Sequence, residues 1–159
     1  MINILLCAPQ TYLDGLLNTL SADVQLPSKL LQVGFTTEES DSEIYRKLVE
    51  TTSELNDDSA LLILGEQLGS RGSTLALSLP YEKLIYISGV NLPMVQQLDK
   101  IISDILSRKI NSNDLMLQLV AERILEQGRS SMICSNDLLK GGGDESTVEM
   151  STLSIASSL

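Results

Sequence analysis

A glycine- and hydroxyl-rich segment, residues 65–73, holds residue types that could bind a negatively charged group. Backbone N–H groups of such a loop and the start of a following helix can point at an anion, and Arg71, Ser70 and Ser73 could add donors. The segment lacks the Gly-Lys-Ser/Thr ending of a nucleotide P-loop and the Gly-x-Gly-x-x-Gly spacing of a dinucleotide fold. A small-anion site and an ordinary glycine-rich connection both remain open.

Cys7 is a second candidate for chemistry, because it directly follows the first apolar run of the chain. A cysteine near a helix N-terminus can have a lowered pKa and act as a nucleophile. A buried structural cysteine is the alternative, since free cysteine is among the most often buried residue types. Cys134 is far away in no metal-like spacing, so we expect no disulfide, no metal site and a reducing compartment.

The chain contains no histidine. Imidazole is the only side chain whose ordinary pKa lies near neutrality. Its absence excludes a Ser-His-Asp or Cys-His nucleophile, a zinc site with histidine ligands and a phosphohistidine relay within this chain. We expect no cofactor.

The composition predicts a globular protein of one domain: 159 residues, 43% of them hydrophobic and 20% charged. Eleven Lys and Arg residues against 21 Asp and Glu residues give a net charge of −10, which argues against nucleic acid and anionic membrane surfaces as partners. No apolar run approaches the roughly 20 residues of a spanning helix, and the N-terminus lacks the pattern of a secretory signal. We expect a cytoplasmic protein.

Alternating apolar runs and helical patterns predict the elements that position these candidates. Strands are expected over residues 2–6, 30–35, 60–64 and 83–88, and Pro9 ends the first. Helices are expected over residues 11–20, 74–79, 95–106 and 115–125, the last capped by Ser112, with a further helix from Ser40 or Ser42 to about Leu55.

This order predicts an α/β fold: a three-layer, open and mostly parallel sheet of about four strands with helices on both faces. Residues 1–135 would form the domain, and residues 136–159 a Gly/Ser-rich C-terminal tail or linker. Ligand sites in such sheets lie at the carboxyl ends of the strands, where three segments should meet: residues 7–10, 65–73 and 89–93.

The segment Gly89-Val-Asn-Leu-Pro-Met94, after the fourth predicted strand, resembles a family motif. It is similar to the Gly-Val-Asn-hydrophobic-Pro-Met segment of the IIA component of the mannose (mannose, fructose, sorbose) class of the bacterial phosphoenolpyruvate-dependent sugar phosphotransferase system (PTS). The likeness spans roughly residues 2–129 and is specific mainly in that segment. It implies a role in sugar transport and phosphorylation.

In that family the first strand leads into a Gly-Thr-His-Gly-like turn, whose histidine receives phosphate and passes it on. The matching turn here is Cys7-Ala8-Pro9-Gln10, which places Pro9 at the phosphoacceptor position. The proline nitrogen is locked in the amide and offers no basic lone pair. The resemblance therefore implies a IIA-like chain that cannot carry phosphate on histidine.

The resemblance also supplies the remaining site residues. Glu66 matches the family's acidic residue after the third strand, and residues 69–73 loosely match its Gly-Gly-Ser-Pro segment. Either a pocket persists that binds a partner without relaying phosphate, or the loop is kept only for packing. The candidate binding residues are Pro9, Gln10, Glu66, Gln67, Gly69, Ser70, Arg71, Ser73 and Asn91.

Two other functions remain open. The run Ile4-Leu-Leu-Cys-Ala8 also resembles the opening of IIB domains of the cellobiose and lactose class, whose phosphoacceptor is a cysteine. Cys7 would then be the phosphoryl carrier, although this chain lacks the longer Gly/Ser-rich loop of that class. The other alternative is an unrelated α/β domain that binds a small anion.

The resemblance implies the IIB component and the histidine-containing phosphocarrier protein as partners, with contact to the membrane permease only through them. It also implies a homodimer, because the family exchanges a short strand between subunits after its last helix. Here that strand could only be the apolar run from Met132 to Cys134, which could equally be a helix end that packs on its own domain.

Overall fold

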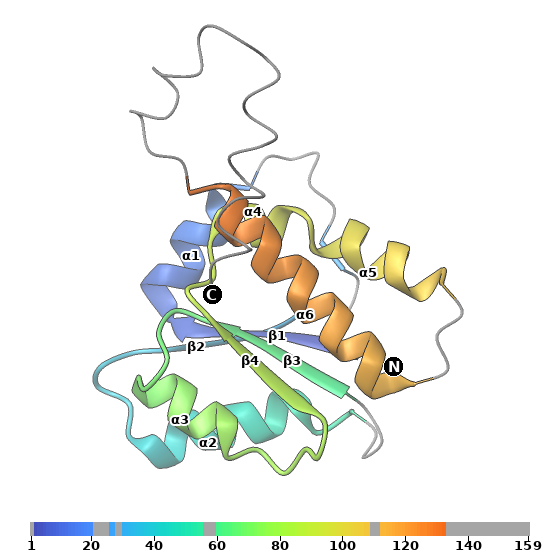
Figure 1. The fold of residues 1–159 in the computed structure, drawn as a ribbon. Coiled ribbons are helices and arrows are strands. Elements are labelled where there is room, and N and C mark those ends of the chain that lie inside the picture. The colour runs from blue at the N-terminus through green and yellow to red at the C-terminus, as the bar shows by residue number, and fades with distance from the viewer. Residues whose placement is uncertain (1, 21–25, 28–29, 56–59, 109–111, 133–159) are drawn as a thin grey trace, which may run out of the picture. The chain divides into compact units, whose positions relative to one another are not determined.

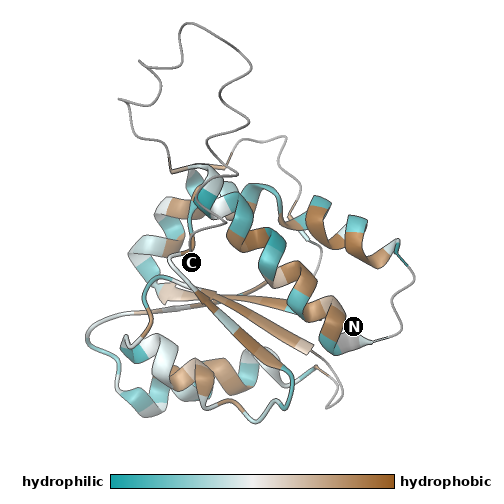
Figure 2. Ribbon diagram, in the orientation of Figure 1, coloured by the Kyte–Doolittle hydropathy of each residue, from teal (hydrophilic) through white to brown (hydrophobic). Residues whose placement is uncertain are grey.

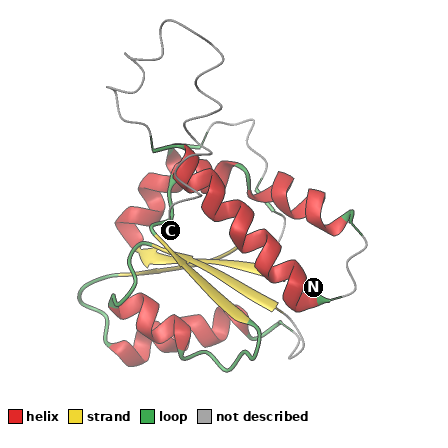
Figure 3. Cartoon of the chain, in the orientation of Figure 1, coloured by secondary structure: helices red, strands yellow, loops and turns green. Residues whose placement is uncertain are grey.

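The computed structural model describes residues 2–20, 26–27, 30–55, 60–108 and 112–132. Within them, four strands form one parallel sheet with the order β2-β1-β3-β4 (Figures 1 and 3). The strands are β1 (Ile2–Pro9), β2 (Leu30–Phe35), β3 (Ala60–Gly65) and β4 (Leu84–Ser88). The predicted α/β fold class is confirmed.

Helices cover both faces of the sheet (Figure 1). The helices of one face are α1 (Gln10–Asn18), α4 (Leu92–Gln96), α5 (Leu98–Leu106) and α6 (Asn113–Ser130). Those of the other face are α2 (Asp41–Thr52) and α3 (Arg71–Leu77). The sheet thus separates two hydrophobic clusters, as the three-layer prediction requires.

The two central strands are buried on both faces. All six residues of β3 are buried, and so are residues 3–8 of β1. Successive side chains of a strand point to opposite faces, so Leu6 packs toward α1 while Leu5 and Cys7 pack toward α2 and α3. This double burial explains the uninterrupted apolar runs of the sequence, which Figure 2 shows as brown strands.

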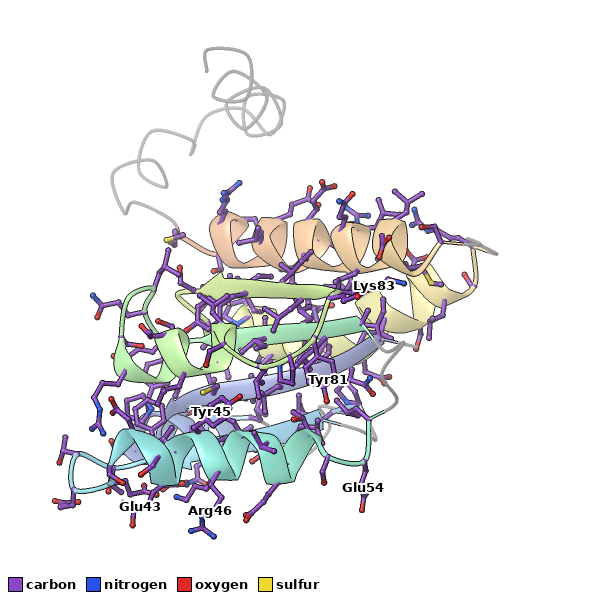
Figure 4. All side chains as sticks on the ribbon, turned by 90° about the horizontal axis from the view of Figure 1, so that it is seen from below. Glu43, Tyr45, Arg46, Glu54, Tyr81 and Lys83 are labelled. Atoms are coloured by element: carbon purple, nitrogen blue, oxygen red, sulfur yellow. The ribbon has the colours of Figure 1, made fainter. Side chains whose placement is uncertain are left out.

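Two predicted helix caps are present. The Ser40 side chain accepts from the Glu43 N–H, and the Glu43 carboxylate accepts from the Ser40 N–H at 2.8 Å, which forms a capping box at the start of α2. Ser112 Oγ accepts from the Leu115 N–H at 3.3 Å. In Figure 4, Glu43 and Arg46 point away from the sheet on the outer side of α2.

The first strand and first helix differ from the prediction. β1 continues to Pro9 and α1 begins at Gln10, so residues 7–10 do not form a loop. Pro9 has φ −50° and ψ 138°, a backbone conformation that its ring permits at the last position of a strand. Cys7 consequently lies inside the strand.

Other element boundaries also shift. α3 begins at Arg71 rather than residue 74, because Ser70 caps it, and the predicted helix 95–106 is two helices that meet at Gln97. α6 runs beyond both predicted ends, whereas α1 ends at Asn18 and α2 at Thr52.

No helix among the described residues has the length and apolar character needed to cross a membrane. Residues Met1–Arg129 form one compact unit, which contains the four strands of the described residues. Cys134 and the predicted boundary at residue 135 lie outside the described residues.

A candidate site at the carboxyl ends of the strands

The parallel register brings the predicted segments to one edge of the sheet. Cys7 pairs with Gly65, and Gly65 pairs with Ser88. Beyond the paired residues, the Gly89 N–H donates to the Glu66 carbonyl at 2.8 Å, and the Val90 N–H donates to the Gly65 carbonyl at 3.0 Å. The ends of β1, β3 and β4 therefore lie together.

Pro9 lies at the wall of a small cavity of about 160 Å³. The other lining residues come from the end of β2, the loop after it and the start of α3: Phe35, Thr36, Thr37 and Arg71. The phosphoacceptor position implied by the resemblance thus borders a pocket, but it presents a saturated ring there.

The guanidinium of Arg71 is held by the loop that precedes α2 and by the first residue of that helix. Its Nε donates to Asp41 Oδ1 at 2.8 Å, and a terminal nitrogen donates to the Glu39 carbonyl. Glu39 in turn pairs with Lys47, and this hydrogen bond is the largest of the causes that lower the pKa of the Glu39 carboxyl. Both cations therefore already have carboxylate partners in the described structure.

Gln10 is exposed, but its amide has contacts within the chain. Its amide packs on Gly34 of β2 so closely that a Cβ there would lie 1.9 Å from Gln10 Oε1. Its Nε2 donates to Asp14 Oδ1 at 2.8 Å. The Gln10 amide is thus packed and hydrogen-bonded against residues of its own chain.

Hydrogen bonds to one backbone carbonyl hold the loop from Glu66 to Ser70. The Gln67 carbonyl accepts from Ser70 Oγ at 2.9 Å, from the Ser70 N–H at 3.5 Å and from the Tyr86 hydroxyl at 3.4 Å. Gly69 has φ +83°, a left-handed conformation that favours glycine. The loop is therefore a defined turn.

The serines expected to bind an anion build the first turn of α3 instead. Ser70 Oγ accepts from the Ser73 N–H at 3.3 Å, and Ser73 is buried with its hydroxyl donating to the Ser70 carbonyl at 2.9 Å. Serine is a preferred N-cap residue, so the residue types that suggested an anion site also fit a helix start.

Glu66 is exposed, and it lies within electrostatic range of two tyrosines. Burial raises the pKa of the Tyr12 phenol, and the Glu66 charge raises it further. The pKa of Tyr86 is raised to about 12, mainly by burial, with a smaller contribution from Glu66. Among the described residues no cation pairs with Glu66.

Tyr12 and Tyr86 are residues of this edge that sequence reasoning missed. The Tyr12 hydroxyl donates to the Val90 carbonyl across the end of β3, and the Tyr86 ring lies over Gly65. A partly buried tyrosine usually finds a partner for its hydroxyl. From the sequence, this tendency predicts that each tyrosine hydroxyl has a hydrogen-bond partner, but it does not identify that partner.

Asn91 is a structural residue of the segment that carried the family resemblance. Its Oδ1 accepts from the Met94 N–H at 3.2 Å and caps α4, while its Nδ2 donates to the Gly128 carbonyl at 3.5 Å. Gly89 has φ +75°, which lets the chain turn from β4 into this cap. The motif therefore links β4, α4 and α6.

The thiol of Cys7 is buried, with only 2% of the residue exposed. Burial raises its pKa to about 12, and its Sγ lies 3.9 Å from the Gly72 carbonyl oxygen. A protonated, enclosed thiol is a poor nucleophile. The geometry therefore favours the structural interpretation of Cys7 over the phosphoacceptor. The described residues also contain no group of acidic or cysteine side chains suited to a metal ion.

Neither a protein-family model nor a curated protein sequence matches this chain significantly. Solved structures, however, match most of it. The phosphotransferase system component EIIA from Streptococcus agalactiae is 20% identical with a TM-score of 0.63, and the match covers 86% of this chain and 99% of that protein.

Two further structures give the same result. The PTS IIA protein associated with the fucose utilization operon of Streptococcus pneumoniae is 20% identical with a TM-score of 0.64, over 87% of this chain and 96% of that one. A proposed phosphoenolpyruvate-dependent sugar PTS permease from Klebsiella pneumoniae is 15% identical with a TM-score of 0.61, over 87% and 93%. The predicted resemblance is thus confirmed at the level of the fold: this chain has the fold of PTS IIA proteins.

Proposed function

We propose that this chain is a IIA-like component of a mannose-family sugar PTS that binds protein partners of that system and does not carry phosphate on histidine. The observation that carries this proposal is Pro9, at the junction of β1 and α1 in a chain without histidine. The fold shared with PTS IIA proteins supports the first part of the proposal.

The residues at the carboxyl ends of the strands support the second part of the proposal, that this chain does not carry phosphate. The Pro9 nitrogen belongs to an amide and cannot accept a phosphoryl group. The neighbouring thiol of Cys7 is enclosed and protonated, and Ser73 is buried. Glu66 and Gln67, at the start of the loop that follows β3, are exposed and can bind a partner.

The proposed partners are the IIB component and the histidine-containing phosphocarrier protein, which would dock on the strand-end edge around Pro9, Glu66 and Ser70. We propose a cytoplasmic homodimer that reaches the membrane permease through these partners. Residues 1–135 would form the domain, and residues 136–159 a tail or linker.

A phosphotransfer assay tests this function. The chain is incubated with phosphoenolpyruvate, enzyme I and the phosphocarrier protein, beside an active mannose-family IIA protein as positive control, and intact masses are measured. We expect the control to gain a phosphoryl group and this chain to gain none. A phosphoryl group on any residue of this chain would contradict the proposal, and one that is lost in Cys7→Ser would identify Cys7 as the carrier.

A binding measurement tests the other part of the proposal, that this chain binds protein partners of the PTS. Titration calorimetry of the chain with the phosphocarrier protein and, separately, with the IIB component should give saturable binding for at least one of them. If the chain binds neither of them, the proposed function is wrong.

A further inference from the structure

Leu68 stands exposed on the loop between β3 and α3. It is 62% exposed, and it follows Glu66 by two residues. Single exposed leucines are common on protein surfaces, so exposure by itself indicates nothing. The loop that carries Leu68 and the charge beside it are more informative.

The backbone on both sides of Leu68 is held in place. The preceding carbonyl, that of Gln67, accepts from two donors of Ser70 and from the Tyr86 hydroxyl, and the following residue is Gly69 in a left-handed conformation. A contact residue on a fixed loop loses less conformational entropy on binding than one on a mobile loop. The backbone that carries Leu68 is thus held in one conformation before a partner arrives.

The charge of this edge is unbalanced. Arg71 and Lys47 are neutralised within the chain, since Arg71 pairs with Asp41 and Lys47 pairs with Glu39. Glu66 has no cationic partner among the described residues, and the full chain carries a net charge of −10. A partner that brings a positive charge to Glu66 would therefore meet a carboxylate that takes part in no ion pair among the described residues.

We infer that Leu68 and Glu66 form a two-point anchor for a protein partner that offers an apolar depression beside an arginine or lysine side chain. Leu68 fills the depression, and the carboxylate of Glu66 pairs with the cation. This inference rests on the proposed function, because it states how the docking edge recognises its partner.

The test compares single variants with matched controls in calorimetric titrations against the phosphocarrier protein and the IIB component. Leu68→Ser removes the apolar contact, and Leu77→Ser is its control because Leu77 is 47% exposed on α3. Glu66→Gln removes the charge, and Glu82→Gln, at an exposed position, is its control. All four substitutions are at the surface, so circular dichroism should show an unchanged fold.

For the partner that binds, we expect Leu68→Ser and Glu66→Gln each to weaken binding at least about fivefold, and the two controls to change it less than about twofold. Glu66→Gln should also reduce the salt dependence of the affinity, because one charge pair is lost.

Binding that persists with unchanged affinity in both variants would overturn the anchor and leave the proposed function intact. Equal weakening in the variants and their controls would overturn it as well. If neither partner binds the unsubstituted chain, the proposed function fails, and the anchor fails with it.

Discussion

The hydroxyl of Tyr12 donates a hydrogen bond to the carbonyl of Val90, and this bond joins the first helix to the segment that follows the last strand. β1 and β4 are not neighbours in the sheet, because β3 lies between them. The bond therefore spans the end of β3, at the point where Glu66 begins the β3–α3 loop. It fixes the first helix and the segment after β4 relative to one another.

Tyr12→Phe should lower the free energy of unfolding by about 1 kcal/mol, because the partly buried Val90 carbonyl loses its side-chain donor. Urea unfolding followed by circular dichroism measures the change. Tyr45→Phe is the control, since no hydrogen bond of the Tyr45 hydroxyl is seen among the described residues. Equal stability of Tyr12→Phe and the unsubstituted chain would show that the bond does not fix this edge.

Gly65→Ala should destabilise the protein by about 2 kcal/mol, because it overpacks the end of β3. A Cβ at this position would lie 1.8 Å from the Tyr86 hydroxyl oxygen and 3.0 Å from the Cys7 carbonyl oxygen, and the backbone atom cannot move away.

Gly15→Ala provides the opposite control. Gly15 lies inside α1, and a Cβ added there would meet nothing within 4 Å, so alanine should raise the free energy of unfolding by roughly 0.5–1 kcal/mol. If thermal unfolding placed both variants on the same side of the unsubstituted chain, the close packing of Tyr86 on Gly65 would be in doubt.

The sequence predicted the sheet well, because strands buried on both faces leave continuous apolar runs that few other structures require. It predicted the caps at Ser40 or Ser42 and at Ser112 for a similar reason: these hydroxyls precede a helical pattern, and the structure selects Ser40. The break at Gln97 was missed, since apolar residues continue at helical spacing on both sides of it.

The candidate site was harder to predict than the fold. Ser70, Ser73 and Asn91 have side chains that either cap a helix or bind a ligand, and residue type alone does not distinguish the two. The partner of Tyr12 was missed because Val90 lies 78 residues away in the chain, and such a bond has no local pattern.

Ser40→Ala should cost about 1 kcal/mol at neutral pH, because α2 loses the side chain that accepts from its first turn. The hydrogen bonds with Ser40 hold the pKa of the Glu43 carboxyl below its ordinary value of 4.5. Because the Glu43 pKa is lower in the folded state, the ionised carboxylate stabilises the fold at pH values above its ordinary pKa. That contribution is lost as the pH falls through the folded-state pKa.

The difference in stability between the Ser40→Ala variant and the unsubstituted chain should therefore shrink as the pH is lowered from 7 through the titration of Glu43. Urea unfolding at a series of pH values measures it. A difference that grows toward acid pH would contradict the capping box.

Cys7 should resist alkylation in the folded protein. Its thiol is buried, and a pKa of about 12 leaves roughly one thiolate in ten thousand at pH 8. In a Cys134→Ser background, where Cys7 is the only thiol, iodoacetamide should react far faster in denaturant than in buffer. Fast labelling of the folded chain would show that the Cys7 thiol is accessible and reactive, which would support its role as a nucleophile.

The central claim is that this chain binds its partner but cannot take the phosphoryl group from it. Native mass spectrometry of the chain mixed with the phosphorylated histidine-containing carrier tests both halves in one spectrum. The predicted result is a complex whose dissociated subunits show the phosphoryl group still on the carrier and none on this chain. A phosphoryl group found on this chain after dissociation would contradict the claim.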